Sequence, residues 1–361
     1  MGTVRLLLAL SVLLFHAGLL FGFTIANNTI AVLSFFVISG FYMAMILDGK
    51  YDPAREKLLF YSNRFLRIFP LYWLMLSLFI LLTSIKYFFH IGSDDNAITL
   101  YLHNTSSMPL WVFIGSLVNF IMRNITLLLA VDYVVPINAY PGYLFVQQAW
   151  TLQIELLFYL LAPFIVRLSN KVFFVFCLMY LLVVFGVFIP FHFLASTLTI
   201  LLLSDLLFFL LGIIGYRFIY KHLQEMNVPI FILYGIFICF ILYLLLYNFI
   251  PIIFSFPFLQ ISDVFYFIVL VFSIPFIFLL TQKNRFDRMI GQLSYPIYIT
   301  HFLIIKIFDN VHIFYINSNA KVIAIICLTL FTSIFIMRYF ENPLDSYRHK
   351  HLKPLLNLSK R

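Results

Sequence analysis

Some titratable residues lie near the middle of long apolar stretches of the sequence, where a charged side chain is costly and therefore suggests a function. The candidates are His16, Glu155, Asp205 and His301, with Lys306 as a further one. A neutral imidazole is tolerated in an apolar site and can accept a proton, which is the task of a general base. A buried carboxylate beside it could orient the imidazole, whereas an unpaired carboxylate would take up a proton itself. These residue types therefore predict a polar site that moves protons.

Arg5 and His16 stand eleven residues apart in one apolar run. Eleven residues make about three helical turns, so both side chains project from roughly the same face, about 16 Å apart along the axis. We expect Arg5 at the edge of this span and His16 just past its middle. The spacing favours His16 as a base that works with Arg5, and the alternative is a packed histidine bonded to a neighbouring helix.

Two further arginines, Arg64 and Arg67, occur in the stretch FYSNRFLRIFPLYWL, just before an apolar run that we expect to begin at Pro70. Residues three apart at the start of a helix share a face. The helix N-terminus attracts anions, and guanidinium groups suit phosphates. The stretch predicts a phosphate-binding pair, and simple anchoring at the membrane boundary is the alternative.

The stretch GQLSYPIYITHFLI places Ser294, Tyr298 and His301 at positions i, i+4 and i+7, which form one stripe of a helix. A polar stripe in an apolar helix predicts a polar pocket, or else a hydrogen-bonded interface between helices. Asp205, in another apolar run, needs a hydrogen-bonding or charged partner whichever of these is right. Gly40, among bulky residues in FFVISGFYMA, predicts a close approach between two helices.

The elements that must position these residues are membrane spans. Of the 361 residues, 63% are hydrophobic and 10% are charged, whereas a soluble domain has about 25% charged residues. Eleven apolar runs are long enough to cross a bilayer. They lie near residues 6–25, 30–47, 68–87, 110–130, 147–166, 172–191, 195–216, 228–249, 262–281, 291–309 and 321–338.

The distribution of basic residues decides which of these runs span. If all eleven crossed the bilayer, the later basic clusters would fall outside, but they fall inside if the run near 110–130 does not cross. That run contains Asn119, Arg123 and Asn124, which are costly at the bilayer centre. The sequence therefore predicts an all-α bundle of about ten transmembrane helices, with one additional re-entrant or interfacial helix near 110–130 and both termini in the cytoplasm.

The predicted topology also divides the chain into regions. Residues 1–345 form the predicted membrane domain, and residues 346–361 form a basic cytoplasmic tail. The segment from about 88 to 146 is the largest predicted outer feature and could meet a sugar. The net charge of +9 lies in short clusters that the topology explains, so nucleic acid is not an expected partner.

The sequence lacks the motifs of several common activities. The chain has no Walker-type phosphate loop, no G-x-S-x-G elbow and no H-E-x-x-H pair, so ATP-driven pumping, serine hydrolysis and zinc proteolysis have no support. None of the three cysteines has a C-x-x-C partner or a metal-ligand neighbour, and we predict no metal site.

Taken together, the motifs resemble those of the acyltransferase family 3 membrane proteins of bacteria, which acylate surface sugars. The similarity runs from Arg5 to about Pro343, and the matching pieces occur in the family's order. These are Arg5 with His16, SFFVISGF, NRFLRIFPLYWL, AWTLQIELLFYLLAP, Asp205 with LLG, LSYPIYITHF and ENP.

The resemblance implies an acyl-CoA co-substrate, acetyl-CoA foremost, taken from the cytoplasm, and no permanently bound cofactor. It implies an acceptor hydroxyl on a cell-surface polysaccharide, lipopolysaccharide or glycolipid precursor, and a location among the lipids of the bacterial inner membrane. Some relatives carry a fused soluble esterase-like domain, which we do not expect here.

Site roles also follow from the resemblance. His16 matches the family's essential first-helix histidine, and the arginines that hold the donor match Arg5, Arg64 and Arg67. Glu155 matches the acid of the Trp-x-x-x-x-Glu motif, although Leu156 stands where relatives often have a second acid.

We expect His16 to remove the proton of the acceptor hydroxyl, with Glu155 beside it as a second catalytic residue. The expected lining of the acceptor side is Ser294, Tyr298, His301 and Asp205. A proton-coupled transporter or flippase for a glycan or lipid-linked solute is the alternative, since it too needs buried charges. A sensor or assembly protein without catalysis is a further alternative.

Overall fold

The structure of the chain is a computed structural model that describes residues 1–49, 57–89, 109–127, 144–191, 197–249, 261–309, 318–348 and 350. Over these residues the secondary structure is helical, and the only β feature is an isolated bridge between Leu20 and Phe23. The predicted all-α class is confirmed. Most of the predicted outer segment and most of the predicted basic tail lie outside the described residues.

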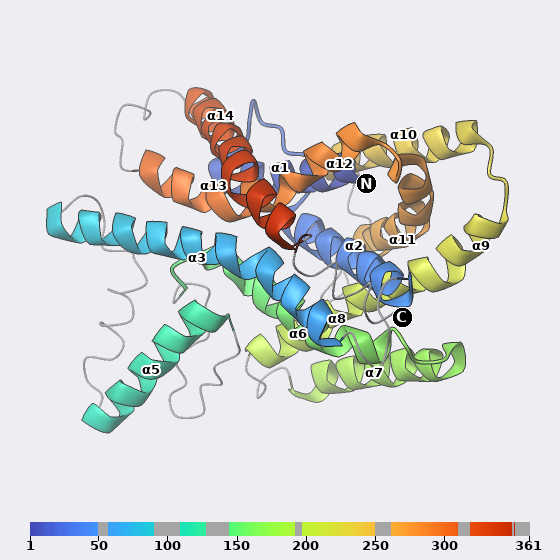
Figure 1. The fold of residues 1–361 in the computed structure, drawn as a ribbon, viewed down its shortest axis with the longest axis horizontal. Helices are drawn as coiled ribbons and strands as arrows, with labels where there is room; N and C mark the ends of the chain where they lie inside the picture. The colour runs from blue at the N-terminus through green and yellow to red at the C-terminus, as the bar shows by residue number, and fades with distance from the viewer. Residues whose placement is uncertain are drawn as a thin grey trace.

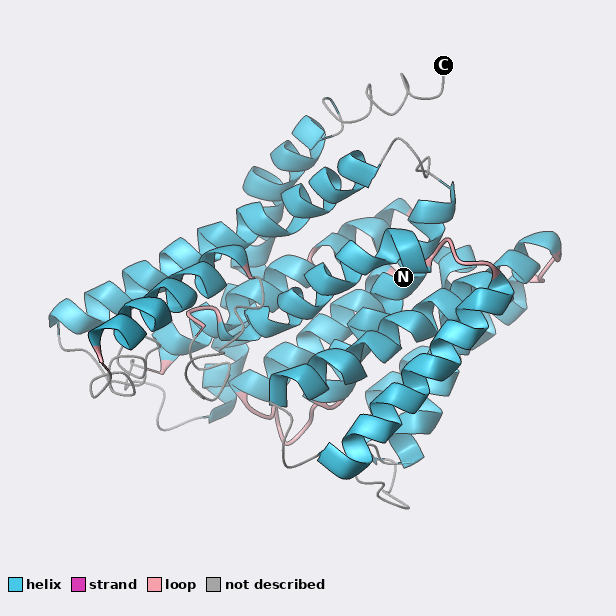
Figure 2. Cartoon of the chain, turned by 90° about the horizontal axis from the view of Figure 1, so that it is seen from below, coloured by secondary structure: helices cyan, strands magenta, loops and turns pink. Residues whose placement is uncertain are grey.

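Each of the eleven predicted apolar runs overlaps one of the described helices (Figure 1). These helices are α1 (Gly2–Ala17), α2 (Asn28–Gly49), α3 (Lys57–Phe89), α5 (Leu110–Thr126), α6 (Trp150–Ile165), α7 (Asn170–Phe191), α8 (Thr197–Ile214), α10 (Ile230–Leu246), α11 (Ile261–Thr281), α13 (Ser294–Phe308) and α14 (Ser318–Ile336). A short helix, α12 (Arg285–Gln292), precedes α13, and α8 continues through Gly215–Tyr220 into α9 (Lys221–Glu225). Figure 2 shows that most of the helices run side by side along one direction.

Seven helices in the described part of the chain are long and apolar enough to cross a membrane. Three shorter apolar helices accompany them, at Gly2–Ala17, Leu110–Thr126 and Asn170–Val184. The protein is therefore a multi-pass membrane protein, while the count of ten spans stays a prediction. The re-entrant or interfacial placement of α5 also stays a prediction. Its C-terminal end is tied to α3, where the Trp73 indole N–H donates to the Ile125 carbonyl over 2.9 Å, and Figure 1 shows it at the edge of the bundle.

Two glycines let α2 and α8 pack backbone to backbone. A Cβ added to Gly40 would lie 2.1 Å from the carbonyl oxygen of Phe209, and one added to Gly212 would lie 2.0 Å from that of Val37. Both distances are far inside van der Waals contact, so only glycine fits at these positions. The close helix approach predicted at Gly40 is confirmed, and its partner glycine lies on α8.

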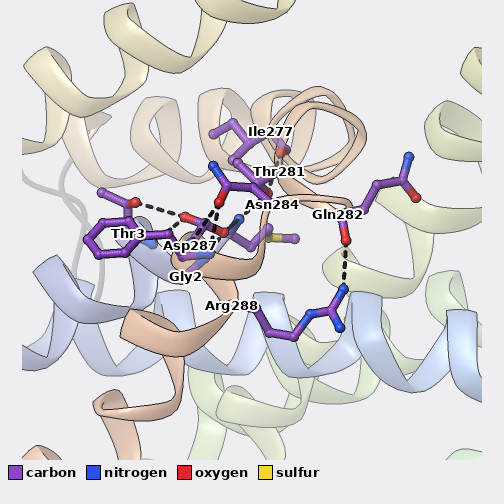
Figure 3. Close-up of polar contacts among 10 residues, drawn as sticks. Gly2, Thr3, Ile277, Thr281, Gln282, Asn284, Asp287 and Arg288 are labelled. Atoms are coloured by element: carbon purple, nitrogen blue, oxygen red, sulfur yellow. Dashed lines mark hydrogen bonds and ion pairs between the residues drawn. The ribbon is translucent and has the colours of Figure 1, made fainter.

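The N-terminus of α1 is held by the carboxylate of Asp287 on α12 (Figure 3). This side chain accepts hydrogen bonds from the backbone N–H of Gly2 over 2.7 Å and from the N–H and hydroxyl of Thr3 over 2.8 Å each. The amino group of Met1 donates to the same carboxylate over 2.7 Å. These bonds satisfy N–H groups that a helix start leaves unpaired. They also fix the position of Arg5, one turn further along α1.

The predicted helix start at Pro70 is wrong. Helix α3 begins at Lys57 and runs through the proline, so Arg64 and Arg67 lie within the helix and not at its N-terminus. A proline in a helix interior removes one backbone hydrogen bond. Ile68, Phe69 and Leu71 beside it are buried in the bundle, and this packing keeps the helix continuous. The helix dipole therefore adds no attraction for anions at these arginines.

Candidate functional site

A cavity of about 410 Å³ opens at the N-terminal end of α1. Its walls come from α1, α2, α3, α6, α11, α12 and α13. Ligand pockets in proteins typically have volumes of about 300–1,000 Å³. Because helices from both halves of the sequence contribute, the cavity exists only in the packed bundle.

All three arginines predicted to bind a donor line this cavity. Arg5 comes from α1, whereas Arg64 and Arg67 come from α3, and Arg5 and Arg67 lie close enough to interact electrostatically. Arg64 is buried, and its guanidinium carbon lies 5.8 Å from the centre of the Tyr159 ring. Arg67 keeps an accessible surface and faces the open space. Like charges repel, so this arrangement favours a bound anion.

Glu155 lines the same cavity, one turn before Tyr159 on α6. Its carboxylate accepts a hydrogen bond from the Ser39 hydroxyl over 2.9 Å and another from the Tyr159 hydroxyl. Its charge also acts on Arg5 and Arg67. The carboxylate therefore belongs to the arginine cluster.

The expected pairing of Glu155 with His16 does not appear among the described residues. His16 lies at the opposite end of α1 from Arg5 and contacts the rings of Phe15, His301 and Phe302. It does not line the cavity. The pairing fails because α6 presents Glu155 level with the first turns of α1, and His16 lies three turns further along.

The polar stripe of α13 leads from the cavity toward His16. Ser294 and Tyr298 line the cavity, and the Tyr298 hydroxyl lies 2.9 Å from that of Thr151. His301 follows one turn later and is fully buried, with its ring centre 5.9 Å from that of Tyr298 and 5.6 Å from that of His16. The stripe thus serves both as a pocket wall and as a buried helix interface.

Asp205 is the one proposed site residue that lies away from both ends of this stripe. It is buried on α8, and its charge acts on Tyr180 of α7. It does not line the cavity. The structure therefore does not bring Asp205 together with Ser294, Tyr298 and His301.

Several residues in the cavity or near it were not identified from the sequence. Ser39 and Tyr159 bond to Glu155, and Arg288 of α12 also lines the cavity. Glu341, in the ENP stretch that follows α14, interacts electrostatically with Arg67 and Arg5. Spacing signals only Tyr159, which stands four residues after Glu155 on one helix. The others come from different helices, and no local pattern links them.

The carboxylate of Asp287, which holds α1, has a perturbed pKa. Burial raises the pKa of this group, but hydrogen bonds from the amino group of Met1 and from the backbone N–H groups of Thr3 and Gly2 outweigh that effect and hold the pKa below its usual value. The carboxylate is therefore charged at neutral pH and stabilises the positive end of the α1 dipole.

Comparison with known proteins identifies one family. The family model of acyltransferase family 3, described as an acyltransferase domain, matches residues 2–338. No curated protein and no solved structure matches the chain. The matched region includes every helix that lines the cavity, and it includes His16 and His301. The chain therefore belongs to acyltransferase family 3.

Proposed function

We propose that the protein transfers an acyl group, with acetyl as the first candidate, from cytoplasmic acyl-CoA to a hydroxyl of a cell-surface polysaccharide, lipopolysaccharide or glycolipid precursor. The observation that carries the proposal is the cavity that collects Arg5, Arg64 and Arg67 from two helices. Guanidinium groups bind phosphate through paired, charge-assisted hydrogen bonds. Coenzyme A presents several phosphates on one molecule, which suits a cluster of this kind.

The arrangement along α1 gives the two ends of the site different tasks. The phosphates bind at the Arg5 end, and the thioester arm extends along the stripe of Ser294 and Tyr298 toward His16. His16 takes the proton of the acceptor hydroxyl as its oxygen attacks the thioester carbonyl. The proton leaves with the thiolate of coenzyme A when the C–S bond breaks. A positioned base of this kind contributes about 10²–10⁴-fold to the rate.

Glu155 has a different role in this proposal from the one expected from the sequence. Its carboxylate is bonded to Ser39 and Tyr159 and lies among the arginines. We assign it to holding the guanidinium groups of Arg5 and Arg67 in place for the donor. The donor side of the site thereby keeps a net positive charge without leaving three cations uncompensated.

The proposed location is the bacterial inner membrane, with the cavity on the cytoplasmic side. The basic residues between α2 and α3 and after α11 support this orientation. It places the donor cavity where acyl-CoA is available and His16 nearer the side of the surface glycan.

Mass spectrometry of the surface glycans tests the proposal. Cells are compared with wild-type protein, with no protein, and with His16→Ala at a matched membrane level. We expect the added mass of an acyl group, acetyl first, on a surface glycan, and we expect it to require the wild type and to be lost with His16→Ala. An unchanged acyl pattern in all three, with altered glycan export or solute content, would instead support the transporter alternative.

A further inference from the structure

His301 is a fully buried imidazole that the proposed reaction does not yet use. Its Nδ1 lies 3.2 Å from the carbonyl oxygen of Ile297. A carbonyl oxygen only accepts hydrogen bonds, so Nδ1 carries the hydrogen and Nε2 presents a lone pair. In the described part of the chain, Nε2 has no hydrogen-bond partner. A buried acceptor without a partner is costly, so its lone pair calls for a donor.

Among the described residues, the imidazole of His16 packs beside His301 and has a ring N–H to offer. The two imidazole centres are 5.6 Å apart, and their planes differ by 31°. Phe302 packs against both rings, at 4.5 Å from His16 and 4.9 Å from His301. At this separation the two rings share no direct hydrogen bond, and a bridging water or a rotation of the less buried His16 can join a ring N–H of His16 to Nε2 of His301.

We propose that His301 is the positioning residue of His16: its Nε2 accepts a hydrogen bond from the His16 ring and so fixes which His16 nitrogen faces the acceptor hydroxyl. This inference rests on the proposed acyl transfer. In a catalytic triad a carboxylate performs the same task for its histidine. Here Glu155 is committed to the arginine cluster, and a neutral imidazole supplies the acceptor without burying a further charge.

The proton balance of the reaction is unchanged by this arrangement. His16 receives the proton of the hydroxyl as the new ester bond forms and returns it to the departing thiolate of coenzyme A. During that interval the His16 imidazolium donates to Nε2 of His301. His301 stays neutral throughout and makes no contact with the substrate.

The test uses inverted membrane vesicles that contain the full-length protein, supplied with radiolabelled acetyl-CoA, and counts the label transferred to the endogenous glycan fraction. His301→Leu keeps a similar volume but removes the acceptor. We expect it to lower the maximal rate by about tenfold or more, up to the about 10²–10⁴-fold that a positioned base contributes, without changing the KM for acetyl-CoA. His301→Gln, whose amide oxygen can accept at the place of Nε2, is expected to restore a large part of the rate.

Two further variants separate positioning from packing. In a His16→Ala background, His301→Leu is expected to add little further loss, because residues that act as a unit are not additive. Thr300→Val is the matched control, since Thr300 is buried on the same helix but bonds to Pro296 and approaches Ser333. It is expected to transfer label at the wild-type rate.

Three results would overturn the inference. They are a wild-type rate in His301→Leu, an equal loss in the Leu and Gln variants, and losses that multiply in the double variant. If wild-type vesicles transfer no label, the proposed acetyl transfer itself is wrong and the inference falls with it. The wild-type measurement therefore distinguishes the two failures.

Discussion

One cavity contains Arg5, Arg64 and Arg67. In the sequence, the whole of α2 lies between Arg5 on α1 and the other two arginines on α3. The cavity also contains Glu155, whose bonds to Ser39 and Tyr159 hold it among the guanidinium groups. At the scale of single residues, this cluster of cations is the proposed donor site. The proposed base, His16, lies apart from it at the far end of α1.

The arginine cluster predicts a specific loss of donor affinity. Arg67→Ala removes a cation that faces the cavity and is expected to raise the KM for acetyl-CoA by about 10–100-fold, the equivalent of one charged hydrogen bond of about 1.5–3 kcal/mol. The KM for the acceptor should change little. The measurement is initial rates in vesicles at varied donor and acceptor levels.

Arg285→Ala is the matched control for that experiment, because Arg285 is exposed on α12 and does not line the cavity. Like Arg67→Ala, it removes a positive charge from the predicted cytoplasmic side of the protein. If both variants raise the two KM values equally, or merely lower membrane insertion, Arg67 serves as a topological anchor.

Separation of the base from the carboxylate leads to a second prediction. Since no described contact joins His16 to Glu155, the rate losses from His16→Ala and Glu155→Gln are expected to multiply in the double variant. Residual acyl transfer in vesicles measures each loss. A double variant no slower than His16→Ala alone would show that the two side chains act as one unit after all.

At the scale of elements, the bundle depends on the contact between α2 and α8. Gly40→Ala places a methyl group 2.1 Å from a backbone oxygen of the facing helix. The helices must separate, and overpacking of this kind costs about 1–3 kcal/mol. We expect a lower thermal unfolding temperature of the purified protein.

Gly235→Ala provides the comparison for Gly40, because a Cβ added there meets nothing within 4 Å. Gly235 lies inside α10, where alanine is the better helix former by about 1 kcal/mol. The unfolding temperature should hold or rise in this variant. Equal destabilisation by both substitutions would mean that α2 and α8 are not in close contact.

The junction of α1 and α12 predicts a pH dependence of stability. The folded-state pKa of Asp287 lies below its ordinary value of 3.8. Its contribution to stability is therefore present above that ordinary value and is lost as the pH falls through the lower, folded-state pKa. Thermal unfolding measured from neutral pH down to about pH 3 should show this loss, and Asp287→Asn should flatten the curve.

Asp309→Asn serves as the control for the pH experiment. Asp309 forms an exposed ion pair with Lys321, at 2.7 Å, and exposed pairs contribute little to stability. Its substitution should leave the pH curve of the wild type unchanged. A curve flattened equally by both substitutions would contradict the role of Asp287 in holding α1.

At the scale of the whole molecule, the proposal requires the two ends of α13 to lie on opposite sides of the membrane. After replacement of the native cysteines, Lys283→Cys should react with an impermeant maleimide in inverted vesicles only. Asp309→Cys should react in intact spheroplasts only. Labelling of both positions from the same side would overturn the predicted topology.

The sequence by itself determined the helices, because long apolar runs can satisfy their backbone only as helices in a membrane. It also determined features that lie within a single helix. These are the shared face of Arg64 and Arg67, the stripe of Ser294, Tyr298 and His301, and the small residue Gly40 that permits a close helix approach.

Only the tertiary structure decided how these faces meet. It brought Arg5 and Arg67 to one cavity, bonded Glu155 to Ser39 and Tyr159, and set His301 beside His16. Helical periodicity specifies directions within one element, whereas contacts between distant elements depend on the packing of the whole bundle. For the same reason α3 continues through Pro70, since buried neighbours from other helices outweigh the local preference of the proline to end it.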